Sequence, residues 1–369
     1  MLVERPRTRS TILSLGAEQG QIHWVFLVSE TIMTSFVYYC RAIFNTGAFI
    51  GSAIPLGQNF HAKEMKKVND GSYIIILVLM TLGFVLALFL APPEKVIRND
   101  GTRVTKVYFP SVRHELMGLV NTMRYEPFIF SLFPFFWASN WFYTYQFNDM
   151  NAYYFNIRTR ALNNLMYWFM QIFGALTFGS FLDVQSLSRR SRGAAGWVIL
   201  FVLVNVIWGG GVPFLQTTAR KMPSPNMDLY DDGYAAKLWL YMFFGFLDAM
   251  WQTFAYWMMG ALSNNPQKLA YYSGIQSAGA AVVWRLDGIG VSFAALYYSS
   301  WGLCAGSMLL TALVLAFKIT ETNITQDDYL TEETNNAQSL TVECPLGTVK
   351  EQSPQTKVME QFDQNTKAF

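Results

Sequence analysis

The sequence predicts an all-α membrane protein, a polytopic bundle of helices, and three observations support this class. The 369 residues are 52% hydrophobic and only 14% charged, whereas soluble proteins carry about 25% charged residues. Apolar segments recur along the chain, and about 20 residues of helix cross the ~30 Å hydrocarbon core of a bilayer. The longest polar stretches are confined to one connector and one tail. We therefore expect a lipid bilayer to be the main surrounding of the protein.

Composition and motifs argue against several other classes. A net charge of +2 from scattered Lys and Arg lacks the concentrated basic face that nucleic acids require. The cysteines, Cys40, Cys304 and Cys344, and three isolated histidines have no disulfide or metal-ligand spacing. No phosphate-binding loop or nucleophile elbow is present. We expect no enzymatic activity, no cofactor, no metal and no nucleic-acid partner.

Eight apolar segments are predicted to cross the membrane. They cover residues 37–56, 72–91, 127–147, 161–182, 196–214, 237–258, 269–287 and 291–317. The resulting divisions are an unassigned stretch (1–35), two spans (36–92), a connector (93–126), six spans (127–318) and a polar tail (319–369). Pro134 predicts a kink in the third span.

The connector carries six basic residues between Lys95 and Arg124. Its apolar residues recur at near-helical spacing: Val112, Leu116, Leu119 and Val120. This pattern fits an amphipathic helix on the membrane surface, and equally a solvated linker helix. Because cytosolic loops are enriched in basic residues, the connector predicts that its own side of the membrane is cytosolic.

An even number of spans places both ends of the membrane region on that same side. The tail holds nine acidic residues against three lysines, a composition typical of disorder. We therefore expect a disordered cytosolic tail. Asn323 lies in a glycosylation sequon, and a cytosolic position predicts that it stays unmodified.

The sixth predicted span carries polar groups at mid-depth. On a helix, Asp248, Gln252 and Tyr256 share one face, a pattern typical of a lined cavity. A carboxylate at this depth is costly unless it meets water or a partner, so Asp248 is the strongest site candidate. The alternative is a structural hydrogen-bond anchor. Three more amides are candidates for the cavity lining, although single buried amides more often join helices: Gln276, Asn140 and Gln171.

Two patterns of small residues predict close helix packing. Gly47 and Gly51 form a GxxxG spacing in the first span, and Ser273, Ser277 and Ala281 recur every four residues in the seventh.

Arg41 is unusual within the first span. An isolated buried arginine is costly, so we expect that it extends toward an end of the helix or that the span begins later.

Several motifs resemble a known family. They are DAMWQ (248–252), YWMMGALSN (256–264), QSAGA (276–280), WRLD (284–287), FNTGAFIGSAIPLGQN (44–59), RNDGTRV (98–104) and the stretch 138–164. Together they resemble the fungal Unc-ninety-three-like membrane proteins, relatives of the major facilitator superfamily, over roughly residues 36–318. The resemblance implies a transporter of a small solute, or an accessory protein that regulates ion channels or escorts a partner membrane protein.

The resemblance also implies two six-helix halves with the substrate site between them. Six predicted spans follow the long connector and two precede it, so the carboxyl half looks complete and the amino half truncated. A gene model that begins downstream of the true start and a genuinely short product both explain this pattern. An inactive truncated product is a further alternative.

Overall fold

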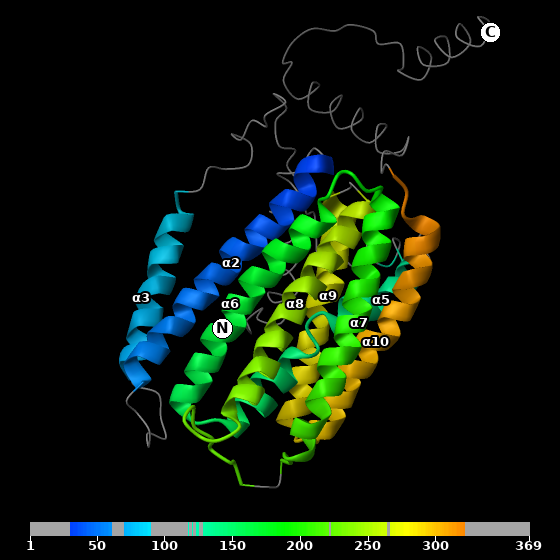
Figure 1. Cartoon of the computed structure of the whole chain (residues 1–369). Helices are drawn as coiled ribbons and strands as arrows, with labels where there is room; N and C mark the ends of the chain where they lie inside the picture. Colours follow the sequence, from blue (N-terminus) through cyan, green and yellow to red (C-terminus); the bar gives the residue numbers. More distant parts are fainter. Residues whose placement is uncertain are drawn as a thin grey trace, which may run out of the picture. The chain divides into compact units, whose positions relative to one another are not determined.

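The computed structural model describes residues 30–60, 70–89, 128–220, 223–263 and 266–321, with four single residues between 117 and 124. The helices are α2 (Glu30–Asn59), α3 (Asp70–Ala87), α5 (Ile129–Ala138), π-helix η2 (Tyr145–Ala152), α6 (Ile157–Leu182), α7 (Arg189–Gln216), α8 (Tyr234–Leu262), α9 (Pro266–Gly288) and α10 (Phe293–Lys318). Among the described residues the only β-type pairing is an isolated bridge between Phe155 and Met227. The all-α prediction is confirmed, and Figure 1 shows the elongated helices of the bundle side by side.

Helices occur at all eight segments predicted to span the membrane. In the described part of the chain, α6, α7 and α10 have both the length and the hydropathy that a membrane span requires. The apolar helices α3 and α5 are shorter, and α8 carries the polar groups discussed below. The side chains of α3 are largely exposed and apolar from Tyr73 to Leu86, as contact with lipid requires. The count of eight crossings stays a prediction.

The third predicted span, 127–147, is wrong as a continuous helix. Helix α5 ends at Ala138, where the backbone N–H groups of Ser139 and Trp141 bond to carbonyls three residues earlier. After this tight turn the chain widens into η2, whose turns contain buried polar residues. Rare π-helical turns often mark functional sites. Asn140 therefore lies in a turn between two helices.

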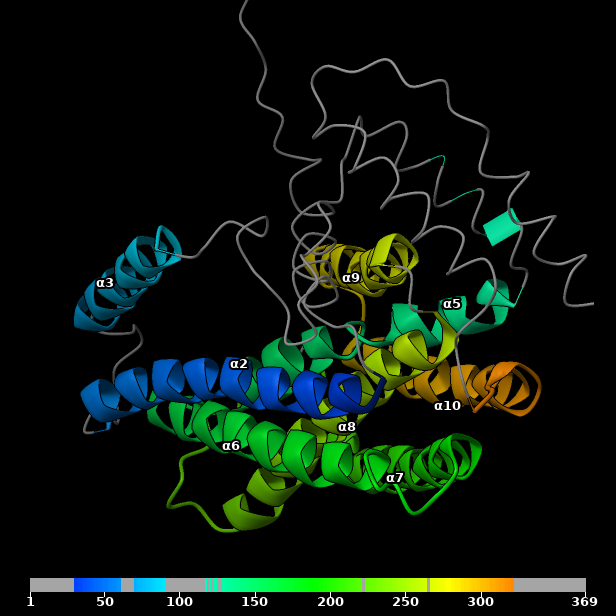
Figure 2. The ribbon, with the colours of Figure 1, turned by 90° about the horizontal axis from the view of Figure 1, so that it is seen from above.

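Helix α2 runs antiparallel to α6 and also contacts α8, as Figure 2 shows from above. Tyr38 of α2 lies against Gly179, and the rings of Phe49 and Phe169 are 6.3 Å apart. The rings of Phe178 and Phe254 lie 6.4 Å apart between α6 and α8. Three helices thus meet along one seam.

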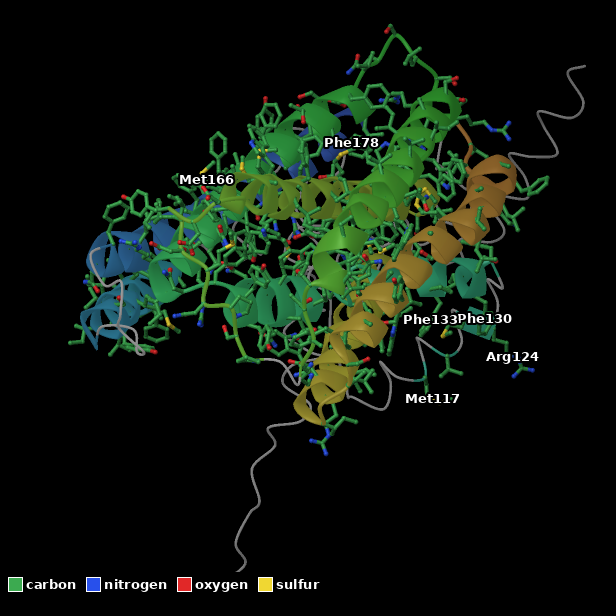
Figure 3. The ribbon with its side chains drawn as sticks, turned by 60° about the horizontal axis from the view of Figure 1, so that its bottom comes forward. Met117, Arg124, Phe130, Phe133, Met166 and Phe178 are labelled. Carbon is green, nitrogen blue, oxygen red and sulfur yellow. The ribbon has the colours of Figure 1, made fainter. Side chains whose placement is uncertain are left out.

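Figure 3 illustrates how far burial differs within the bundle. Phe178 is buried among the packed helices, whereas Phe130 of α5 lies at the edge and is exposed.

Close packing in the described chain uses glycines other than the predicted ones. A Cβ at Gly245 would lie 2.6 Å from the Tyr167 carbonyl oxygen, and one at Gly279 would lie 2.3 Å from that of Trp137. These positions require glycine because the obstructing atoms belong to backbone. Helix α8 therefore approaches α6 at Gly245, and α9 approaches α5 at Gly279.

The GxxxG prediction is not met by the described residues. A Cβ at Gly47 or Gly51 would meet no atom within 4 Å, because the buried face of α2 carries Tyr38, Ala42 and Asn45 instead.

In α9, Ala281 of the predicted packing face is exposed among the described residues, so its packing role stays a prediction. Ser273 is buried, and the side chain of Ser277 lies outside the described residues. Helix α9 turns Gly279 toward α5, and this rotation leaves Ala281 outside the contact.

The remaining predictions concern parts of the chain that the structure does not describe. They are the unassigned stretch up to residue 29, nearly all of the connector and the tail from residue 322 onward.

Candidate functional site

Asp248 lies in the middle of α8 with only 1% of its surface exposed. Its Oδ1 accepts a hydrogen bond from the Tyr143 hydroxyl at 3.0 Å. Its Oδ2 accepts from the Tyr167 hydroxyl at 3.0 Å and from the Gln171 amide. Hydrogen bonds to a charged acceptor are about twice as strong as neutral ones, so these donors stabilise the carboxylate inside the bundle.

Arg41 of α2 supplies the opposite charge. Its guanidinium donates to the Tyr143 hydroxyl and interacts electrostatically with Asp248 and Tyr256. The expected extension of Arg41 toward a helix end is wrong, because its side chain reaches the Asp248 network. Helix α2 begins at Glu30, and the later start of the membrane span within it stays a prediction. The signal was present in the sequence, since an arginine and an aspartate in two apolar segments can neutralise each other.

Tyr167 connects Asp248 to the π-helix. The Tyr167 hydroxyl oxygen lies 2.7 Å from Gln146 Oε1 and 3.0 Å from Asp248 Oδ2. A hydroxyl has one proton, so Tyr167 donates to the carboxylate or to the amide, and not to both at once. The arrangement can therefore change the number of donors on Asp248 without moving a helix.

Three predicted cavity residues form a second chain of hydrogen bonds beside Asp248. Gln252 Nε2 donates to the Ser139 carbonyl at 2.8 Å, and Gln252 Oε1 accepts from the Gln276 amide. Asn140 Nδ2 donates to the Gln276 carbonyl at 2.7 Å. These contacts join α8 and α9 to the turn after α5, as interhelical amides in membrane proteins commonly do.

The six predicted residues thus divide by their surroundings. Gln171 bonds directly to Asp248, while Gln252, Gln276 and Asn140 form the adjoining chain. Tyr256 is partly exposed and interacts electrostatically with Arg41.

The site is completed by residues that are not among the six predicted to line the cavity. They are Arg41, Tyr143, Gln146 and Tyr167.

Several buried polar atoms around this site have no hydrogen-bonding partner among the residues that the structure describes. They include both side-chain polar atoms of Asn45, Oε1 of Gln171 and Nε of Arg41. Asn45 is fully buried and lies one helical turn from Arg41 on the inward face of α2. Buried polar atoms are normally paired with protein, water or a ligand. A set containing both donors and acceptors fits a polar occupant.

Comparison with known proteins gives the family. No family model matches the chain. An UNC93-like protein of Schizosaccharomyces pombe is 43% identical over 345 residues, covering 91% of this chain and 68% of the relative. The chain belongs to the UNC93-like family.

Other relatives support this UNC93-like assignment. UNC93-like protein 1 of Arabidopsis thaliana is 36% identical over 76% of this chain, and an uncharacterised membrane protein of Schizosaccharomyces pombe is 31% identical over 72%. The chain spans 63% and 56% of the lengths of these two relatives. With the apolar helices described above, the relatives show a multi-pass integral membrane protein.

In this UNC93-like protein, a buried ion pair fixes the loop between α7 and α8. Arg158, at the start of α6, donates two hydrogen bonds to the Asp228 carboxylate. Asn156 donates to the same carboxylate at 2.8 Å, beside the bridge between Phe155 and Met227. The Arg158 guanidinium, with help from Asn156, holds the pKa of Asp228 well below its usual range. The loop is therefore anchored through a carboxylate that is ionised at neutral pH.

Proposed function

We propose that this protein is a transmembrane transporter of the major-facilitator type, and that Arg41 and Asp248 form the centre of its site for a small polar solute. The observation that carries the proposal is the set of unpartnered polar atoms beside this charge pair, on Asn45, Gln171 and Arg41 itself. Charged groups inside a membrane segment are costly and commonly mark transport pathways.

The placement of the two charges supports this function. Arg41 lies on α2, before the connector, whereas Asp248 lies on α8, after it. In major facilitator transporters the site lies between two halves that move against each other. A solute that interacts with both charges would therefore interact with elements on both sides of the connector.

The alternative is a membrane protein that transports nothing and regulates or escorts a partner membrane protein. This alternative is favoured by the completeness of the bonding around Asp248 and Gln252, which bind helices together directly. In that case the same residues would act as interhelical anchors in a closed bundle.

Access of water to the site distinguishes the two functions. We would change Tyr256 to Cys in a background with Ser at Cys40, Cys304 and Cys344, and treat sealed vesicles of both orientations with a membrane-impermeant thiol reagent. Phe254→Cys is the matched control, because Phe254 lies on the same helix and is fully buried against aromatic rings.

If the protein is a transporter, we expect the reagent to label Tyr256→Cys in vesicles of at least one orientation and not to label Phe254→Cys. Equal absence of labelling in both variants, with correct membrane insertion, would contradict the transport proposal and favour the anchoring role.

A further inference from the structure

A second, partly buried charge cluster lies away from Asp248, at the end of the bundle where α9 is followed by α10. Arg220, in the loop after α7, contacts both carboxylates of Asp149 and Asp287 through one guanidinium nitrogen. The distance to Asp149 Oδ1 is 3.5 Å, and the contact with Asp287 is closer. Two aspartates therefore share one arginine, and the three groups carry a net charge of −1 when all are ionised.

The cluster is held in place by several elements. Arg220 Nε donates to the Val291 carbonyl at 2.8 Å, and its guanidinium lies 4.5 Å from the centre of the Phe293 ring. Asn148 of η2 donates to Asp287 Oδ2 at 2.8 Å. Asp149 on η2, Asp287 on α9 and the start of α10 are thus joined through the α7–α8 loop.

Asp149 is the buried carboxylate of this cluster, and one of its oxygens lacks a hydrogen bond within the described residues. Its side chain is only 2% exposed, and its Oδ2 has no hydrogen-bonding partner in the described part of the chain. The Asp287 carboxyl lies within hydrogen-bonding range, but two ionised carboxylates have no proton to place between them. Among the described residues, Tyr145 is a further titratable neighbour: it interacts electrostatically with Asp149, and its buried hydroxyl has no hydrogen-bonding partner there.

We propose that the buried Asp149 carboxyl binds a proton and donates it in a hydrogen bond to Asp287 beside Arg220, and that this bond keeps η2, α9 and the α7–α8 loop together. With one proton bound, the cluster is neutral, and the protonated carboxyl has an acceptor within range. Without the proton, two adjacent negative charges face a single arginine, and one of them, on Asp149, is shielded from water, which disfavours the deprotonated form.

The direction of the pH effect follows from proton binding. In the unfolded chain both aspartates are solvated and ionised near neutral pH, so only the folded protein retains the proton. The cluster therefore stabilises the fold at lower pH, and this stabilisation is lost as the pH rises and the proton leaves. The inference does not depend on whether the protein transports a solute.

The test compares melting temperatures of the purified protein in mild detergent from about pH 6 to about pH 9. Asp149→Asn replaces the protonated carboxyl with a neutral amide that can still donate to Asp287. The matched control is Asp232→Asn, which removes one exposed carboxylate from the same loop. We expect the wild type and Asp232→Asn to lose about 2–4 °C or more as the pH rises, and Asp149→Asn to lose much less.

Infrared spectroscopy gives a readout that does not depend on stability. The wild type should show the C=O band of a protonated carboxylic acid at neutral pH, and Asp149→Asn should lack it. If Asp149→Asn folds poorly, Asp287→Asn supplies the same comparison, because it also leaves one carboxylate beside Arg220. The proposal is overturned if the wild type has no such band, or if the Asn variants keep the pH dependence of the wild type.

Discussion

Asp248 receives its hydrogen bonds from two hydroxyls and one amide, so its replacements can separate the loss of charge from the loss of acceptors. Asp248→Asn keeps one oxygen acceptor, whereas Asp248→Leu leaves Tyr143, Tyr167 and Gln171 facing an apolar group. A buried donor left unpaired costs about 1–3 kcal/mol. We expect Asp248→Leu to melt at a clearly lower temperature in detergent than Asp248→Asn.

The control for this comparison is Asp232→Asn, an exposed position that should melt like the wild type. If Asp248→Leu and Asp248→Asn melt at the same temperature, the hydrogen bonds that Asp248 accepts contribute nothing to stability, and only the loss of its charge matters.

Spacing along the sequence is enough to predict that Asp248, Gln252 and Tyr256 share a helix face, because residues four apart lie on one side of a helix. The amides Gln171, Gln252 and Gln276 were also predicted, and all three enter the bonded networks. The hydrogen-bonding partners Tyr143 and Tyr167 could not be predicted from the sequence. Aromatic residues are abundant in the chain, and no local pattern distinguishes a tyrosine hydroxyl that reaches a distant carboxylate.

At the scale of helices, backbone contact at glycine gives a prediction with an internal control. Gly279→Ala places a methyl group 2.3 Å from the Trp137 carbonyl oxygen, whereas Gly274→Ala on the same helix meets nothing within 4 Å. Alanine also favours helix by up to about 1 kcal/mol over glycine. We therefore expect Gly274→Ala to keep or raise the melting temperature and Gly279→Ala to lower it.

A loss of stability in both glycine variants, or in neither, would contradict the close approach of α9 to α5. The measurement is a thermal melt of each purified variant in the same detergent.

The ion pair between Arg158 and Asp228 predicts that stability depends on pH in the direction opposite to that of the Asp149 cluster. The Arg158 guanidinium lowers the pKa of Asp228, so its stabilisation is present above the ordinary aspartate value of about 3.9 and is lost as the pH falls through the lower folded value. Removing one partner of a buried ion pair costs about 3–5 kcal/mol. We expect Asp228→Asn to lower the melting temperature by a similar amount from about pH 5 to about pH 8.

This interval contains no titration of Asp228, so a penalty that disappears between those pH values would show that the ion pair is not the cause. Asp232→Asn again provides the exposed control in the same loop.

The positions of the helices are predicted better by the sequence than their ends and breaks. The centres of the predicted spans fall within helices, because apolar runs of this length are reliable markers of membrane helices. The break after Ala138 and the π-helix from Tyr145 were not predicted, since both depend on backbone bonds that Pro134 alone does not specify. The inward faces of α2 and α9 carry Asn45 and Gly279 in the described part of the chain, because rotation about a helix axis is set by its neighbours.

At the scale of the whole molecule, the predicted topology places the tail in the cytosol. The basic residues between Lys95 and Arg124 should lie on the cytosolic side with the carboxyl terminus. A tag added after Phe369 should therefore resist protease applied to intact cells and become sensitive after permeabilisation. Removal of the tag from intact cells at the plasma membrane would reverse the orientation, and glycosylation of Asn323 would also place the tail outside the cytosol.

The central claim is that Arg41 and Asp248 act as one charge pair that ties α2, before the connector, to α8, after it. A double-mutant cycle with Arg41→Met, Asp248→Asn and the combined variant measures this coupling through stability in detergent. Each single change leaves one buried charge without its counterpart, which costs about 3–5 kcal/mol. We predict that the double variant loses less free energy of unfolding than the two single variants lose in sum, with a coupling free energy of about 1–3 kcal/mol. Losses that add to within about 0.5 kcal/mol would contradict the pairing of Arg41 with Asp248.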